Sequence, residues 1–227
     1  MEIVLVAGMW LDGSAWSDVA SALTSLGHHP VPLWLPGQGD GSASASLDDQ
    51  LAAVVAAVDA AADPSMVVGH SAAASLAWMA VDARPDKVAK VVFIGGFPAA
   101  DGTAYFDVFD PVDGAVRFPG WEPFEGTDSA DLDEETKRRI ATATVPVPEA
   151  VTHAVVHLRD DRRYRVPVVV VCPEFSAAQA KEWVDTGELP ELSKAYDVSF
   201  VDIESGHWPM FSQPSALAGL LGSLAHD

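Results

Sequence analysis

The chain has 227 residues, which is enough for one large α/β domain that buries its own core. Its 33 acidic residues against 13 basic ones give a formal net charge of -20. This charge argues against nucleic acid and anionic membranes as partners, because both reward clustered lysine and arginine. We therefore expect a small-molecule partner, neutral or cationic rather than anionic, and the sequence leaves a homodimer open.

The start of the chain and its cysteine content indicate an intracellular protein. Residues 1–6 form a short strand pattern with an acid, without a basic leader or a cleavage site. No apolar run approaches the roughly 20 residues that a bilayer span requires. The single Cys172 lies inside an apolar run, where a small core residue is expected. We expect a cytoplasmic location.

Strand and helix patterns alternate through the first part of the chain. Continuous apolar runs are typical of strands buried on both faces, and Ser46 followed by Asp49 is a helix-capping pattern. The alternation predicts an α/β fold whose mostly parallel sheet is flanked by helices. The expected elements are a strand at 3–7, a helix at 14–26, a turn at 28–30, a strand at 31–35, a helix from 46 to about 62, a strand at 66–68, a helix to about 83 and a strand at 88–94.

The alternation stops after residue 95, and a long segment rich in Asp, Pro and Gly follows. We expect residues 97–165 to form a cap, or lid, inserted within a single domain that spans 1–227. Its aromatic residues either line a pocket or hold the cap to the body. Helices are expected in the cap at 131–143 and 148–158. Beyond it we expect a strand at 167–172, a helix at 177–185, a strand at 198–203 and a final helix that Ser212 and Pro214 begin.

Ser71 lies where the apolar run Met66–Val68 turns into helix-forming sequence. Gly69 stands two residues before it and Ala73 two residues after it. Small residues at these positions allow the tight strand-to-helix turn of the G-x-S-x-G nucleophile elbow, here with Ala73 in place of the final glycine. The alternative interpretation is a Gly-Ser turn without chemistry.

A serine hydroxyl needs a base to become a good nucleophile, and histidine is the usual base near neutral pH. His207 follows the last expected strand and so lies at the same carboxyl-end edge of the sheet as Ser71, where ligands bind in open α/β sheets. An ordinary loop histidine is the alternative. His70 is expected to point away from Ser71, and either to pack or to support the residues that react. His153 and His157 are spaced i, i+4, but no third ligand accompanies them, so we expect neither a metal nor a cofactor.

Three segments together resemble the α/β-hydrolase superfamily, and more closely its small esterase and hydroxynitrile-lyase-like branch. They are Gly8–Trp16, Gly69–Ala73 and Gly206–Pro209. The resemblance spans nearly the whole chain and covers the cap least. It implies the α/β-hydrolase fold with an inserted helical cap.

The resemblance also implies roles for particular residues. Ser71 would attack a carbonyl, and His207 would act as general base and then as general acid. The backbone N–H groups of Met9 and Ala72 would form the oxyanion hole. The chain departs from many relatives at Ala7, where they have a histidine. The residues expected at the substrate pocket are Trp10, Trp121 and Trp208.

The acid partner of His207 is less clearly marked. The position expected by spacing is Ser176, which cannot serve. Glu174 lies two residues earlier, and we favour it as the acid. The alternatives are Asp101, which follows the end of the preceding strand of the sheet, and the absence of any direct acid partner.

These roles imply a serine hydrolase that acts on a small ester, thioester or lactone through an acyl-enzyme on Ser71. One alternative is a carbon–carbon or cyanohydrin lyase that uses the same site. A lysine near the pocket would favour the cyanohydrin lyase, and none follows His207. The other alternative is a catalytically degenerate ligand-binding protein of the same fold, although such a protein would need neither Ser71 nor His207.

Overall fold

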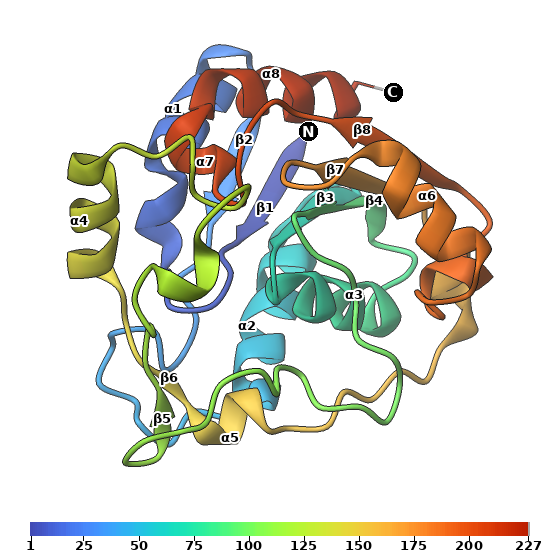
Figure 1. Ribbon diagram of the computed structural model, residues 1–227. Helices are drawn as coiled ribbons and strands as arrows, with labels where there is room; N and C mark the ends of the chain where they lie inside the picture. Colours follow the sequence, from blue (N-terminus) through green and yellow to red (C-terminus); the bar gives the residue numbers. More distant parts are fainter. Residues whose placement is uncertain (227) are drawn as a thin grey trace.

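A parallel sheet of six strands forms the centre of the molecule, and the computed structural model describes residues 1–226 (Figure 1). The strand order is β2-β1-β3-β4-β7-β8, and each neighbouring pair runs parallel. This arrangement confirms the predicted fold class. The strands are β1 Glu2–Val6, β2 His29–Pro32, β3 Ser65–His70, β4 Val88–Ile94, β7 Val168–Cys172 and β8 Val198–Asp202.

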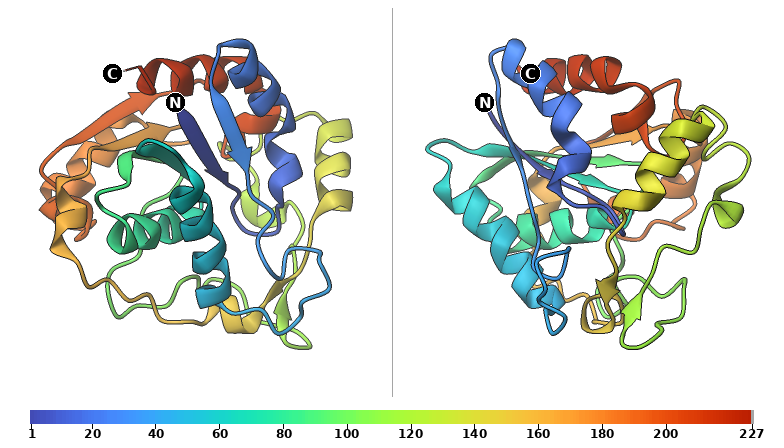
Figure 2. Two further views of the ribbon diagram at one scale, coloured as in Figure 1. Left: turned by 180° about the vertical axis from the view of Figure 1, so that it is seen from behind. Right: turned by 90° about the vertical axis from the view of Figure 1, so that its left-hand side faces the viewer.

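Alternate residues of the central strands point to opposite faces of the sheet and build two hydrophobic cores. In β1, Val4 and Val6 belong to one core, and Ile3 and Leu5 belong to the other. Helices α2, α3 and α6 cover the first face, and α1 and α8 cover the second (Figures 1 and 2). Burial on both faces is why these strands are continuous apolar runs in the sequence. The helices are α1 Ser17–Ser25, α2 Leu47–Ala60, α3 Ala73–Ala83, α6 Ala177–Asp185 and α8 Pro214–Leu224.

Local sequence signals set the starts of several helices. Asp49 N–H donates to Ser46 Oγ at 3.2 Å, and Ser46 N–H donates to Asp49 Oδ2 at 2.9 Å, which is the capping box predicted for α2. Ser176 begins α6 with the same motif. The helix expected at 14–26 begins instead as a 3-10 turn, Gly13–Trp16, and continues as α1.

The edge strand β2 differs from the sequence-based expectation. His29 and Pro30, expected in a turn, belong to β2 and pair with β1. The strand ends at Pro32 and does not continue to Leu35. An edge strand needs hydrogen bonds on one side alone, so it tolerates prolines that would interrupt a central strand. The other expected strands of the sheet are confirmed.

The segment 97–165 contains less helix than expected. Helix α4, Glu134–Ala143, forms within the expected range, but the helix expected at 148–158 is reduced to α5, Glu149–Thr152. Beyond α5 the chain pairs with an earlier part of the same segment, where Val156 N–H donates to Thr103 O at 2.8 Å. This pairing occupies the Val156 N–H, which a longer helix would use for a hydrogen bond within the helix. The segment also holds the antiparallel strands β5 Ala115–Val116 and β6 Val147–Pro148, and the 3-10 turns Glu122–Phe124 and Asp161–Arg165.

The shortening of α5 separates the two histidines that were expected on one helical face. His153 follows the end of α5 and lies 3.6 Å from carboxylate oxygens of Asp107 and Glu149, whereas His157 lies beyond the helix. Within residues 1–226, no group of three or more His, Cys, Asp or Glu side chains is placed to hold a metal ion. None of the helices in this range combines the length and apolarity needed to cross a membrane. Between β7 and the C-terminus, the structure adds a 3-10 turn at Leu192–Lys194 and helix α7 at Pro209–Ser212.

Candidate active site

Ser71 occupies a sharp turn between β3 and α3. Its backbone φ is 55°, in the left-handed region that residues other than glycine rarely adopt. Its N–H donates to Ile94 O at the end of β4, at 2.8 Å, which fixes the turn to the neighbouring strand. Gly69 and Gly96 make the turn sterically possible: a Cβ on Gly69 would collide with Ala73 O, and one on Gly96 would lie 2.5 Å from Ser71 O. The local geometry is that of a nucleophile elbow.

The loop after β1 passes close to this turn. A Cβ on Gly8 would lie 2.9 Å from Ser71 Cβ, so only glycine allows the approach. Trp10, two residues on, has a φ of 64°. Within residues 1–226, neither Met9 N–H nor Ala72 N–H has an acceptor. Both groups are therefore free to donate to a substrate oxygen.

His207 lies after β8 and is held by Glu174 from the loop after β7. Its Nδ1 lies 2.7 Å from Glu174 Oε1, and the two side chains are 14% and 15% exposed. Because the carboxylate accepts, Nδ1 carries a proton; the neutral tautomer that fits this contact has its lone pair on Nε2, as a general base requires. Ser176 lies apart from this pair and caps α6. The carboxylate of Asp101 accepts from Leu158 N–H at 2.9 Å, within the inserted segment.

Three further contacts fix the loop that carries His207. His207 N–H donates to Asp128 O at 2.8 Å, and Gly206 N–H donates to Asp131 Oδ2 at 2.7 Å. His70 Nε2 lies 2.8 Å from His207 O. Asp128 and Asp131 were missed from the sequence because they lie in an acidic part of the inserted segment, with no spacing that relates them to His207.

His70 supports His207 from the side of the sheet. Its ring is buried, and its centroid lies 4.9 Å from that of His207. Burial, reinforced by the neighbouring His207, lowers the pKa of His70 to about 3, so the ring is neutral at physiological pH. Since His207 O can only accept, Nε2 of His70 donates. His70 therefore supports the loop of His207, which is one of the two roles expected of it.

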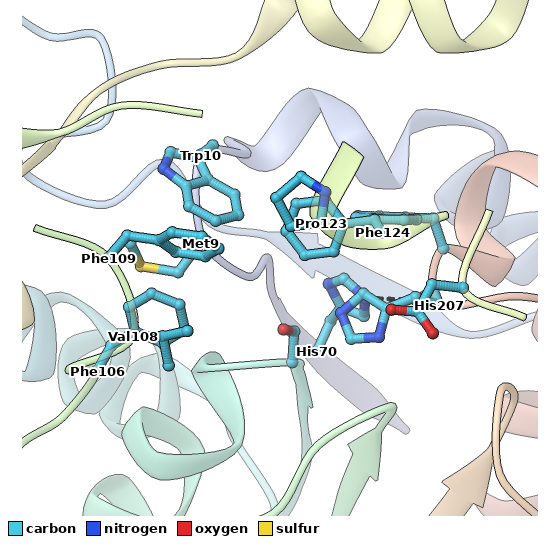
Figure 3. Close-up of a pocket in the computed structure, with 12 residues that line it drawn as sticks. Met9, Trp10, His70, Phe106, Val108, Phe109, Pro123, Phe124 and His207 are labelled. Carbon is cyan, nitrogen blue, oxygen red and sulfur yellow. Dashed lines mark hydrogen bonds between the residues drawn. The ribbon is translucent and has the colours of Figure 1, made fainter. Parts of the chain in front are cut away.

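Ser71 and His207 line one cavity of about 390 Å³ (Figure 3). Trp10 and Trp208 are in its wall, as expected. Trp121 is not: it packs behind Trp208, with ring centroids 5.1 Å apart, and its Nε1–H donates to Lys137 O. The remaining lining residues are Met9, His70, Phe106, Val108, Phe109, Pro123, Phe124 and Asp128.

The aromatic residues of the inserted segment serve both purposes that the sequence left open. Phe106, Phe109 and Phe124 line the cavity and also contact the ring of Trp10, with centroid distances of 5.6 to 6.1 Å. Phe118 packs against Trp10 without lining the cavity. The same cluster thus shapes the pocket and holds the segment against the body of the molecule.

The chain matches the family model described as the alpha/beta hydrolase family over residues 3–220. It is 28% identical, over 124 residues, to a chloroplastic protein of Arabidopsis thaliana provisionally named methylesterase 12. The matched part is 52% of this chain and 36% of that protein. The chain therefore spans little more than a third of the length of this curated relative.

Solved structures of similar fold cover the whole chain. One is an extracellular alpha/beta-hydrolase from a Paenibacillus species, with a TM-score of 0.81 and 18% identity over 100% of both chains. It is described as sharing structural and functional homology with tobacco salicylic acid binding protein 2. Another is a methylesterase from Arabidopsis, with a TM-score of 0.78 and 16% identity over 100% of both chains. At these identities the similarity concerns the fold.

Proposed function

Because the chain belongs to the alpha/beta hydrolase family, we propose that it is a serine hydrolase that cleaves a small ester, thioester or lactone through an acyl-enzyme on Ser71. One observation carries this proposal. A serine on a left-handed elbow shares a cavity with His207, whose Nδ1 is hydrogen-bonded to Glu174. A protein that only binds a ligand has no need of this combination.

In the proposed reaction, Ser71 Oγ attacks the carbonyl carbon of the substrate while His207 Nε2 takes the hydroxyl proton. Glu174 orients the ring and stabilises the imidazolium that forms. The N–H groups of Met9 and Ala72 donate to the developing oxyanion, and one such donor is typically worth about 10²- to 10³-fold in rate. The imidazolium then protonates the leaving group, and the ester bond breaks.

Deacylation repeats these steps with water as the nucleophile. His207 Nε2 removes a proton from the water, whose oxygen attacks the acyl carbon. The second tetrahedral intermediate collapses, and the proton returns to Ser71 Oγ. The acid product leaves, and the serine hydroxyl is restored.

The cavity favours a small substrate with an apolar part. Its volume of about 390 Å³ and its aromatic wall fit a compact ester. The name of the Arabidopsis relative supports an ester of a short alcohol. Among the described residues, no lysine lines the cavity, which favours hydrolysis over cyanohydrin cleavage. In this proposal residues 97–165 act as the cap, because they supply Phe106, Phe124 and other parts of the wall.

Two matched substitutions test the assignment of the acid. We expect Glu174→Gln to lower kcat on a p-nitrophenyl ester by roughly 10³-fold or more, because His207 loses the carboxylate that orients it. Asp101→Asn removes one carboxylate outside the site and should keep kcat within about twofold. Circular dichroism should confirm that both variants fold. Full activity in both variants would refute the role of Glu174.

A further inference from the structure

Among residues 1–226, the cavity wall contains one carboxylate, on Asp128, and no basic side chain other than the two histidines. Asp128 is half-buried, and within residues 1–226 it forms no ion pair with a lysine or arginine. Its contact with a hydroxyl, from Thr127 Oγ1, is long at 3.4 Å. Burial, together with the nearby charge of Glu174, raises the pKa of Asp128, so the carboxylate is poorly compensated where it stands. A cation bound in the cavity would relieve this cost.

The rest of the wall suits a particular kind of cation. Trp10, Phe109 and Phe124 lie in mutual contact, with centroid distances of 5.6 to 6.2 Å, and Phe124 also packs against Trp208 at 5.3 Å. Figure 3 shows Trp10, Phe109 and Phe124 around the cavity. Aromatic faces attract ammonium groups, and most strongly those whose alkyl substituents leave them weakly hydrated. Without Asp128, an apolar wall would favour neutral groups. Without the aromatic wall, Asp128 would not distinguish an alkylammonium group from a metal ion.

We propose that the cavity selects esters that carry an alkylammonium group, held between Asp128 and the aromatic wall while Ser71 attacks the ester carbonyl. The inference rests on the proposed ester hydrolysis and adds the substrate class. Asp128 belongs to the inserted segment, whereas Ser71 and His207 belong to the loops of the sheet. The insertion therefore sets which ester is accepted, and the sheet edge supplies the reacting groups.

A pair of esters with the same shape and different charge tests this proposal. Acetylcholine has a positively charged nitrogen at its branched centre, whereas 3,3-dimethylbutyl acetate has a neutral carbon there. We expect the wild-type enzyme to have a kcat/KM at least about tenfold higher for acetylcholine, at an ionic strength near 0.15 M. In Asp128→Asn the ratio of the two kcat/KM values should fall at least about threefold, to the part of the preference that the aromatic wall supports alone.

Glu125→Gln is the matched control, because Glu125 is exposed on the same segment, does not line the cavity and carries the same charge. This variant should keep the wild-type ratio, which separates the local effect of Asp128 from the general field of an acidic protein. Choline and 3,3-dimethylbutan-1-ol, used as inhibitors of p-nitrophenyl ester hydrolysis, give a second readout. Choline should be the tighter inhibitor in the wild type, and its advantage over the neutral alcohol should shrink in Asp128→Asn.

Three results would overturn the inference. A wild-type ratio at or below one would show that the cavity prefers the neutral ester. An equal fall for both esters in Asp128→Asn would mean that Asp128 acts through His207 and not on the substrate. If Glu125→Gln lowered the ratio as much as Asp128→Asn does, the preference for acetylcholine would come from the net charge of the protein. If instead Ser71 reacts with no acylating reagent and p-nitrophenyl esters are not hydrolysed, the proposed function fails as a whole.

Discussion

Ser71 and Trp10 carry backbone strain at the centre of the site. Their φ angles of 55° and 64° lie in the left-handed region, and Asp113 is the one other non-glycine residue within 1–226 that does so. Such conformations cost about 1–3 kcal/mol each and persist where the surroundings enforce them. Here the contact of Ser71 N–H with Ile94 O and the close passage of Gly8 provide that enforcement. Both strained residues line the cavity, Trp10 directly after Met9 and Ser71 directly before Ala72.

His70 makes the stability of the molecule depend on pH. Its pKa of about 3 in the folded chain lies below the value near 6.5 expected when unfolded, so the unfolded state binds the extra proton as pH falls below 6.5. Stability present above pH 6.5 is therefore lost on acidification, over a window that extends to about pH 3. Lowering the pH from 7 to 5 should therefore reduce the free energy of unfolding by about 2 kcal/mol through this residue.

Urea denaturation of the wild type and of His70→Gln at these two pH values measures that cost. Glutamine keeps an N–H donor for His207 O and does not titrate. The wild type should lose about 2 kcal/mol more than the variant between pH 7 and pH 5. Equal losses would mean that His70 is not held neutral in the folded state.

At the scale of elements, the inserted segment and the loop after β8 form one unit around His207. Asp128 O and Asp131 Oδ2 accept the N–H groups of His207 and Gly206. A residue with a side chain would not fit at position 206, because its Cβ would lie 2.5 Å from Asp131 Oδ1. The position of His207 therefore depends on the segment between β4 and β7 as well as on the sheet.

Removing the side chain of Asp131 should loosen the base without touching the substrate. We expect Asp131→Ala to lower kcat on a p-nitrophenyl ester about tenfold with a smaller change in KM, because His207 spends less time in its productive position. Asp131→Asn keeps an oxygen that can accept from Gly206 N–H and should restore most of kcat. An alanine variant as active as the wild type would contradict this role.

The elements that were predictable from sequence are those whose signals are local. The capping box of Ser46 and the fully apolar strand β7 need no information from elsewhere in the chain. The failures depend on tertiary pairing. Pro30 is in a strand because β2 is at the edge of the sheet, and the helix expected at 148–158 is cut short by pairing with Thr103.

At the scale of the whole molecule, the parallel topology brings distant residues to one edge of the sheet. Met9, Ser71, Glu174 and His207 follow β1, β3, β7 and β8, so each lies at the carboxyl end of its strand. This is why Ser71 and His207 could be paired from sequence alone. Glu174 was already favoured over Asp101 from the sequence, and its carboxylate lies 2.7 Å from His207 Nδ1. Asp128 could not be found because it comes from the segment between β4 and β7.

The far end of the insertion is anchored by a buried polar network. Arg163 and Glu191 are 3% and 1% exposed and lie 3.1 Å apart, and Trp78 Nε1–H from α3 donates to Glu191 at 3.0 Å. Breaking such a pair leaves an uncompensated buried charge, so the network fixes the insertion firmly to the body.

The central claim is that Ser71 is the nucleophile of a hydrolase, and labelling with a fluorophosphonate tests it most directly. We expect the folded wild-type protein to gain the mass of one adduct, on the peptide that contains Ser71, and we expect Ser71→Ala to gain none and to lose ester turnover. A folded wild-type protein that stays unlabelled, or a Ser71→Ala variant that hydrolyses esters at the wild-type rate, would contradict the claim.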